Sequence, residues 1–230
     1  MIKIFENEKK YDGIEEFESK KIETESFNRI RAELLSRRIS FESKEEEAVV
    51  VRAVHSTADF DFAKNIRFSL NAFSKAFSVF ESGKCVIVTD TNMALQGVSS
   101  FLCEKIGIKK TCFMADFDVS ECSKKNNLTR AAVSVDKAAQ TFEGKNVIYA
   151  VGNAPTALVR LRLLFDAGIF EPSLVIAVPV GFVNVVRAKE LIMESKMDFI
   201  AAIGQKGGSG VSAAILNALF HLFLEKNEKS

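Results

Sequence analysis

Five short apolar runs, each followed by a longer amphipathic stretch, constrain the fold of this chain more than any other feature. The runs are Cys85–Asp90, Thr111–Asp116, Asn146–Gly152, Leu174–Val180 and Asp198–Gly204. Their apolarity is continuous rather than alternating, which is typical of strands buried on both faces of a parallel sheet. The intervening pattern predicts helices over Met93–Lys105, Leu128–Phe142, Thr156–Ala167, Val183–Ser195 and Ser209–Glu225. We therefore expect an α/β fold of three layers, with a mostly parallel five-stranded sheet and helices on both faces.

The first eighty residues do not show this alternation. A serine followed three residues later by a glutamate, Ser43 and Glu46, predicts the start of a helix that continues through His55. A second helix is expected over Asn65–Glu81. Because no linker separates this part from the predicted sheet, we expect residues 1–230 to form a single domain in which residues 1–80 are a helical extension.

Composition limits the classes of partner. The chain has 31 lysine and arginine residues and 30 aspartate and glutamate residues, so its net charge of +1 does not favour nucleic acid. The N-terminus is charged, and Pro179 and Gly181 interrupt the longest apolar stretch, so neither a signal peptide nor a membrane-spanning helix is expected. The four cysteines match no metal-binding or redox spacing and are expected to be reduced thiols. These features predict a cytoplasmic protein with no protein-bound metal and no membrane partner.

Two glycine-containing strand ends are candidates for ligand binding, because open parallel sheets bind ligands beyond the carboxyl ends of their strands. The run GQKGGSG could bind an anion through Lys206 and backbone N–H groups, although a capped tight turn explains it equally well. Lys206 precedes the glycines, so the run is not a P-loop, and Gly208, Gly210 and Ala213 match a dinucleotide fingerprint only formally. In VGNAPTA, backbone donors near Asn153 could bind a carboxylate, with an ordinary strand-to-helix turn as the alternative.

His55 is one of only two histidines. If its segment is helical, Arg52, His55 and Asp59 occupy positions i, i+3 and i+7 on one helix face. Histidine titrates near neutral pH, so this cluster is a candidate for acid–base chemistry, although a hydrogen-bonded structural histidine is the more common outcome. Arg130 is a further candidate, because a cation just inside a helix start is unfavourable unless it binds an anion or is solvated.

Seven segments, in their order and spacing, resemble the precorrin-8X methylmutase family, whose members are also called cobalt-precorrin-8 methylmutases. They are VHSTADFDFAKNIRFS, VTDTNM, CFMADFDV, KKNNLTRAA, VGNAPTAL, VIAVPVGFV and GQKGGSGVSAAILNAL. The resemblance implies a flavodoxin-like protein that works as a homodimer, with its active site near the subunit interface and no cofactor. It also implies an isomerase that moves a methyl group from C-11 to C-12 of a corrinoid, giving hydrogenobyrinic acid or cobyrinic acid.

The resemblance also implies roles for particular residues. The family's catalytic histidine matches His55, which is therefore the predicted acid for a 1,5-sigmatropic methyl shift. The substrate carries several carboxylates, so cations and N–H donors at the motif positions are predicted to bind it. The predicted substrate-binding residues are Ser26, Arg52, Asp59, Lys64, Arg67, Thr89, Asp90, Arg130, Asn153, Lys206, Gly207, Gly208 and Ser209. Asp59 is expected to favour a charged imidazole if it lies within about 4 to 6 Å.

The chain departs from the family pattern at three positions. Glu25 and Gln205 stand where the family often has arginine, and Ser56 stands in place of a threonine. The first two changes remove cations from expected carboxylate contacts, but His55 and Arg130 remain, so activity is expected. Two alternatives stay open at this point: a nucleotide-binding module, for which no convincing phosphate loop is present, and a non-catalytic carrier that binds a corrinoid without converting it.

Overall fold

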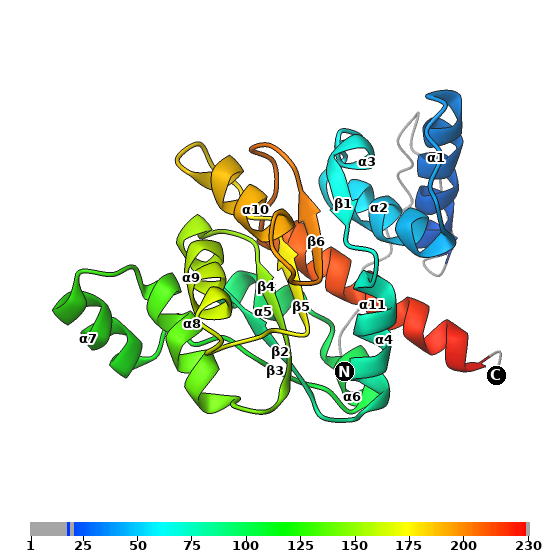
Figure 1. Ribbon diagram of the computed structural model, residues 1–230. Helices are drawn as coiled ribbons and strands as arrows, with labels where there is room; N and C mark the ends of the chain where they lie inside the picture. Colours follow the sequence, from blue (N-terminus) through cyan, green and yellow to red (C-terminus); the bar gives the residue numbers. More distant parts are fainter. Residues whose placement is uncertain (1–17, 19–20, 229–230) are drawn as a thin grey trace, which may run out of the picture.

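The structure is a computed structural model that describes residue 18 and residues 21–228. Within these residues, six strands form one sheet in the order β1-β6-β5-β4-β2-β3 (Figure 1). The strands are β1 (Ile66–Phe68), β2 (Cys85–Thr89), β3 (Lys109–Thr111), β4 (Asn146–Val151), β5 (Leu174–Ala177) and β6 (Phe199–Ala202). The strands from β2 to β6 are parallel and β1 is antiparallel to β6. Taken alone, the five parallel strands have the order of a flavodoxin-like sheet, which confirms the predicted class of fold.

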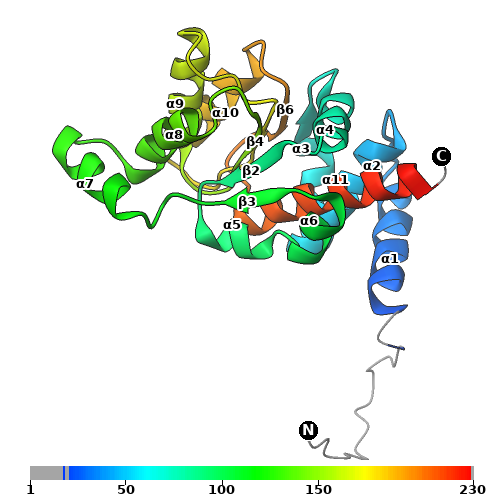
Figure 2. The same cartoon turned by 90° about the horizontal axis from the view of Figure 1, so that it is seen from below.

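Helices cover both faces of this sheet, which is therefore the middle of three layers (Figures 1 and 2). One side carries α1 (Ile22–Ser36), α2 (Lys44–Thr57), α4 (Ala72–Glu81), α5 (Asn92–Gly97), α6 (Ser100–Ile106) and α11 (Ser209–Glu228). The other carries α7 (Phe117–Asn126), α8 (Arg130–Thr141), α9 (Pro155–Asp166) and α10 (Val185–Met193), while α3 (Phe62–Asn65) is a single turn before β1. Alternate strand residues separate the two cores: Ile87 and Ile148 face the first, and Val88 and Tyr149 the second.

The expected number of five strands was wrong, because β1 lies inside a predicted helix. Residues 65–81 instead contain β1, a turn and then α4. Ile66 pairs with Ala202 and Phe68 with Ile200, so the edge of β6 supplies the partner that selects an extended conformation for this short segment. Because the paired residues are distant in the sequence, the residues of β1 alone carry no local pattern that predicts a strand.

Helix boundaries also differ from the expectation. The predicted helix 93–105 is two helices, because the Ser99 side chain caps a new start by accepting a hydrogen bond from the Leu102 N–H. The second predicted strand, Thr111–Asp116, is instead β3, which spans Lys109–Thr111, and α1 and α7 were not predicted. Helix α7 projects from the body, and Val119 is its buried residue (Figure 2).

The N-terminal helices share an apolar core with the sheet. The predicted start of α2 is confirmed: the Ser43 hydroxyl accepts a hydrogen bond from the Glu46 N–H at 3.1 Å. Val50 and Val54 of α2 belong to the same buried cluster as Leu216 of α11 and Ile176 of β5. This packing fixes the end of α2 relative to the sheet. No helix in the described part of the chain is long and apolar enough to cross a membrane.

Candidate active site

The predicted site residues lie along the carboxyl edge of the sheet and on the elements beside it. Thr89 ends β2 and Asp90 follows it, Asn153 follows β4, and Lys206 follows β6. Three strand spacings separate β2 from β6, so this edge spans about 14 Å. The predicted site therefore forms several small groups of contacts along the edge.

His55 lies in the last turn of α2 with an exposed side chain. Its Nδ1 atom is 2.8 Å from the Ser26 hydroxyl oxygen of α1, and the Phe27 ring packs against the imidazole at 5.1 Å in an edge-to-face arrangement. Among the described residues, the other ring nitrogen, Nε2, has no hydrogen-bond partner. The structure therefore joins the predicted acid to the predicted Ser26 and leaves one ring nitrogen available to a substrate.

The expectation that Arg52, His55 and Asp59 share a helix face was wrong for Asp59. Helix α2 ends at Thr57 because Ala58 takes a left-handed conformation with φ of 53°. Asp59 follows that turn, and its N–H donates to the Thr57 hydroxyl at 3.2 Å. Arg52 stays on the helix and forms an ion pair with Glu23 at 3.1 Å, with its guanidinium 5.0 Å from the centre of the Phe27 ring.

Asp59 and Lys206 form an ion pair between two loops. The Lys206 ammonium contacts carboxylate oxygens of Asp59 at 2.6 Å and Asp61 at 2.7 Å. The hydrogen bond from Lys206 lowers the pKa of Asp59, and the two carboxylates raise the pKa of Lys206. Asp59 is therefore engaged by Lys206, and the described residues include no ion pair between Asp59 and His55.

The glycine-rich loop after β6 packs closely against the ends of neighbouring strands. A Cβ on Gly207 would lie 2.1 Å from the Val178 carbonyl oxygen, so glycine is required there. The Gly208 N–H donates to that oxygen at 2.8 Å, and the Ser209 hydroxyl lies 2.8 Å from the Thr91 hydroxyl. These contacts make the loop part of the sheet edge, whereas its sequence also allowed a flexible turn.

The carboxylate-binding corner predicted at VGNAPTA is occupied by the protein's own Asp90. The Asp90 carboxylate accepts hydrogen bonds from the N–H groups of Gly152, Asn153 and Ala154 at 2.8 to 2.9 Å. Burial raises the pKa of Asp90, and the three N–H donors act in the opposite direction. The buried Asp90 therefore holds the corner together, whereas the buried Thr89 hydroxyl donates to the Thr91 carbonyl oxygen at 3.0 Å. Asn153 offers only its exposed side chain to a ligand.

Arg130 and Lys64 are cations that the described part of the structure leaves without an ion pair. Arg130 is exposed in the first turn of α8, where the helix dipole disfavours a cation. Lys64 is exposed on α3, at the same edge. Arg67 instead donates to the carbonyl oxygens of Lys64 and Ile66 at 2.7 and 2.9 Å. Arg130 and Lys64 can thus meet carboxylates of a bound anion.

Phe27, Asp61 and Thr91 contact predicted site residues but were not themselves predicted. Neither was Lys189, whose ammonium donates to the Lys206 carbonyl oxygen at 2.8 Å. The sequence contained a signal for Lys189 alone. This lysine stands four residues after Val185 and three before Ile192, at a position that helical periodicity assigns to the core. The other three residues are recognisable only once α1 and the loops have been placed against their neighbours.

Comparison with known proteins identifies the family. The family model for precorrin-8X methylmutase matches residues 21–222. The chain belongs to the precorrin-8X methylmutase family. The cobalt-precorrin-8 methylmutase of Salmonella typhimurium is 40% identical over 183 residues, which cover 79% of this chain and 84% of that protein. The cobalt-precorrin-8 methylmutase of Priestia megaterium is 38% identical over 198 residues, covering 86% of this chain and 85% of that protein.

A solved structure of the precorrin-8X methylmutase from Thermus thermophilus has the same fold. It aligns with a TM-score of 0.80 at 32% identity and covers 90% of this chain and 98% of that chain. As a member of this family, the protein is an isomerase of corrin biosynthesis that moves a methyl group. The non-catalytic carrier is not favoured by these relatives.

Proposed function

We propose that the protein moves a methyl group from C-11 to C-12 of cobalt-precorrin-8, and that His55 is the acid that assists this shift. The observation that carries the proposal is the 2.8 Å contact between Ser26 Oγ and His55 Nδ1. It holds an exposed imidazole in one orientation, and preorganised donors are effective because they need not reorient during the reaction. The family and the names of the relatives support the same reaction.

The contact with Ser26 links the direction of the hydrogen bond to the position of the imidazole proton. In a neutral imidazole, a hydrogen bond from the Ser26 O–H to Nδ1 places the remaining proton on Nε2. In a charged imidazole, Nδ1–H donates to Ser26 instead and Nε2 again carries a proton. Nε2 is a donor in both of these states, and in the proposed reaction it is directed toward a ring nitrogen or the conjugated system of the substrate. In the other neutral tautomer, Nδ1–H donates to Ser26 and Nε2 is an acceptor. The reaction is intramolecular: the C-11 to methyl bond breaks, the C-12 to methyl bond forms, and the proton is returned.

The carboxylates of the substrate need cations along the same edge. Arg130 and Lys64 are exposed, and neither forms an ion pair with a described residue. Charge-assisted hydrogen bonds from such groups are stronger than neutral ones and orient a polycarboxylate. In our proposal, Arg130 and Lys64 bind carboxylates directly, while Asp90 and Asp59 keep the surrounding loops in place.

The cobalt-containing substrate is proposed from the names of the relatives. The relatives from Salmonella typhimurium and Priestia megaterium, at 40% and 38% identity, are named cobalt-precorrin-8 methylmutases. The relative from Pseudomonas aeruginosa, named precorrin-8X methylmutase, is 31% identical. Cobalt is here a part of the substrate, held by the macrocycle.

We further propose a cytoplasmic homodimer of single-domain subunits. The family resemblance supports the dimer, and exposed apolar side chains support an interface near the site: Phe182 is 85% exposed after β5, and Phe117 is 80% exposed at the start of α7. A shared core between the N-terminal helices and the sheet supports the single domain.

The proposed reaction is tested by mixing the purified protein with cobalt-precorrin-8, and separately with metal-free precorrin-8X, and following the absorption spectrum. We expect conversion of the cobalt form at the higher rate. Faster conversion of the metal-free form would overturn the substrate assignment alone. Binding of both forms without conversion would instead mean that the protein is a carrier.

A further inference from the structure

A buried lysine lies directly beneath the glycine-rich loop that follows β6. Lys189 of α10 has an exposed fraction of 0%. Its ammonium donates to the Gly204 carbonyl oxygen at 2.9 Å and to the Lys206 carbonyl oxygen at 2.8 Å. Among the described residues, no carboxylate forms an ion pair with it. Burying a charged group is unfavourable, so the two hydrogen bonds to the loop are the interactions that compensate for it.

These hydrogen bonds fix the first turn of the loop, ahead of the residues that pack against the end of β5. Gly204 has φ of 76°, a conformation that only glycine adopts without strain, and the loop continues through Gln205 and Lys206 to the tightly packed Gly207. The Gln205 carbonyl oxygen accepts from the Gly181 N–H at 3.1 Å. Lys189 holds the carbonyl groups on either side of Gln205 and so sets the path of this turn.

Lys206 connects the turn to the loop beside His55. Lys189 binds the Lys206 carbonyl oxygen, and the Lys206 ammonium in turn contacts the carboxylates of Asp59 and Asp61 at 2.6 and 2.7 Å. The Asp61 N–H donates to the Asp59 carboxylate at 2.9 Å, and the Asp59 N–H donates to the Thr57 hydroxyl at 3.2 Å. Thr57 ends the helical turn that carries His55. A continuous series of hydrogen bonds therefore runs from Lys189 to the end of α2.

We propose that Lys189 is a positioning residue: it holds the loop of residues 203–208 so that Lys206 can fix the end of α2 and thereby the imidazole of His55. Lys189 cannot touch a substrate, because it is buried beneath the loop. Its effect on catalysis passes through Lys206, Asp59 and Asp61. The inference rests on the proposed role of His55.

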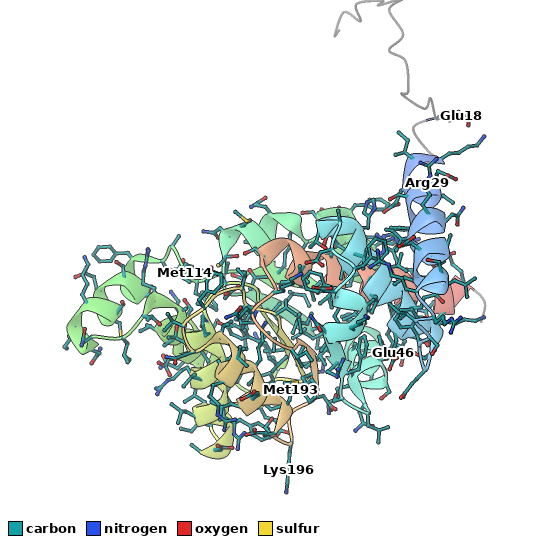
Figure 3. The ribbon with its side chains drawn as sticks, turned by 90° about the horizontal axis from the view of Figure 1, so that it is seen from above. Glu18, Arg29, Glu46, Met114, Met193 and Lys196 are labelled. Carbon is teal, nitrogen blue, oxygen red and sulfur yellow. The ribbon has the colours of Figure 1, made fainter. Side chains whose placement is uncertain are left out.

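The test compares Lys189→Met with Lys196→Met. Methionine keeps the length and apolar character of the lysine side chain but donates no hydrogen bond. Lys196 is an exposed lysine just after α10 that projects from the surface, which makes it the matched control (Figure 3). Methyl transfer is measured with enzyme in excess over cobalt-precorrin-8, so that product release does not enter. Hydrogen exchange of residues 203–208 and 57–61 is measured on the same proteins.

We expect Lys189→Met to lower the single-turnover rate about tenfold to a hundredfold, as small displacements of catalytic groups do. The concentration of enzyme that gives half the maximal rate should change less than the rate itself, because no substrate contact is removed. Exchange should accelerate in both segments. Lys196→Met should match the wild type in every measurement. Equal rates and equal exchange in Lys189→Met and Lys196→Met would overturn the inference.

Two further variants keep the inference testable if Lys189→Met fails to fold. Lys206→Met removes an exposed side chain and should also lower the single-turnover rate and accelerate exchange at residues 57–61. If Lys189→Met folds, the double variant Lys189→Met with Lys206→Met should lower the single-turnover rate no more than the stronger single variant does. The two changes interrupt the same series of contacts, so their effects should not add. A wild-type rate in Lys206→Met would overturn the proposed link to His55. Failure of the wild type to turn over would refute the proposed function, while the exchange measurements would still decide whether Lys189 holds the loop.

Discussion

At the scale of single residues, the site depends on side chains that fix one another. His55 is held by Ser26 and Phe27, and the loop beside it is held by Lys206. The motif resemblance predicted roles for His55 and Ser26, and the structure adds the contact between them. Asp90 shows the limit of such reasoning: its position at a strand end suggested substrate contact, but three local N–H groups already occupy its carboxylate.

Removal of the Ser26 hydroxyl should weaken catalysis without preventing binding. A neutral hydrogen bond contributes roughly 0.5 to 1.5 kcal/mol, so Ser26→Ala should lower the methyl-transfer rate by about twofold to twelvefold. Single-turnover kinetics measures this effect. Ser36→Ala is the matched control on the same helix, because the Ser36 hydroxyl contacts Glu33 of its own turn, at the carbonyl oxygen at 2.8 Å and at the carboxylate at 3.5 Å. Equal rates for the two variants would show that Ser26 does not orient the imidazole.

Lys189 should also make the free energy of unfolding depend on pH. Burial lowers the pKa of Lys189 to about 8, from an ordinary value of 10.5. Between these values the unfolded chain binds more protons than the folded one, so raising the pH favours the folded state. The free energy of unfolding of the wild type should therefore rise relative to Lys189→Met between pH 8 and pH 10.5, by as much as about 3 kcal/mol. Urea denaturation at pH 7 and pH 10 measures the difference, and a value independent of pH would contradict the burial of a charged lysine.

At the scale of elements, the strands that are buried on both faces were predictable because their apolar runs are continuous. Strand β2 and strand β5 are buried throughout, as their sequences indicate. Strand β1 was not predictable, because it has three residues and its conformation depends on pairing with β6. The sequence placed the candidate loops at one edge of the sheet, because they follow the predicted strands. It did not predict the contacts of Asp59, Lys206 and Lys189, because these join segments that are distant in the sequence.

Two glycines near the start of α11 should respond differently to the same substitution. A Cβ at Gly207 would lie 2.1 Å from one carbonyl oxygen and 2.6 Å from another, so Gly207→Ala must displace the loop. A Cβ at Gly210 meets no atom within 4 Å, and alanine is favoured over glycine in a helix by about 1 kcal/mol. Thermal unfolding should therefore show a lower melting temperature for Gly207→Ala and an equal or higher one for Gly210→Ala. A tolerated Gly207→Ala would contradict the close packing of this loop.

At the scale of the whole molecule, the site occupies one edge of a three-layer fold, and exposed apolar side chains lie beside it. Phe182 and Phe117 both face solvent in a single subunit. In the proposed homodimer, at least one of these side chains is covered by the partner subunit. Only the resemblance predicts a site near that interface, since a single sequence carries no direct signal for assembly.

The dimer is tested by sedimentation velocity on the wild type and on Phe182→Ser. The wild type should sediment with twice the 25.4 kDa mass of one chain. Phe182→Ser should shift the equilibrium toward the monomer if this side chain is part of the interface, and Leu70→Ser, which changes a 99% exposed residue, serves as the control. A wild type that is monomeric at micromolar concentration would exclude the proposed assembly.

The most direct test of the account is the rate of methyl transfer in His55→Ala, measured together with binding of cobalt-precorrin-8. General acid catalysis contributes about a hundredfold or more, so the variant should bind the substrate and convert it at least about a hundredfold more slowly. His221→Ala, which changes the other histidine of the chain, should keep the wild-type rate. A His55→Ala protein that binds and converts the substrate at the wild-type rate would contradict the assignment of His55 as the acid.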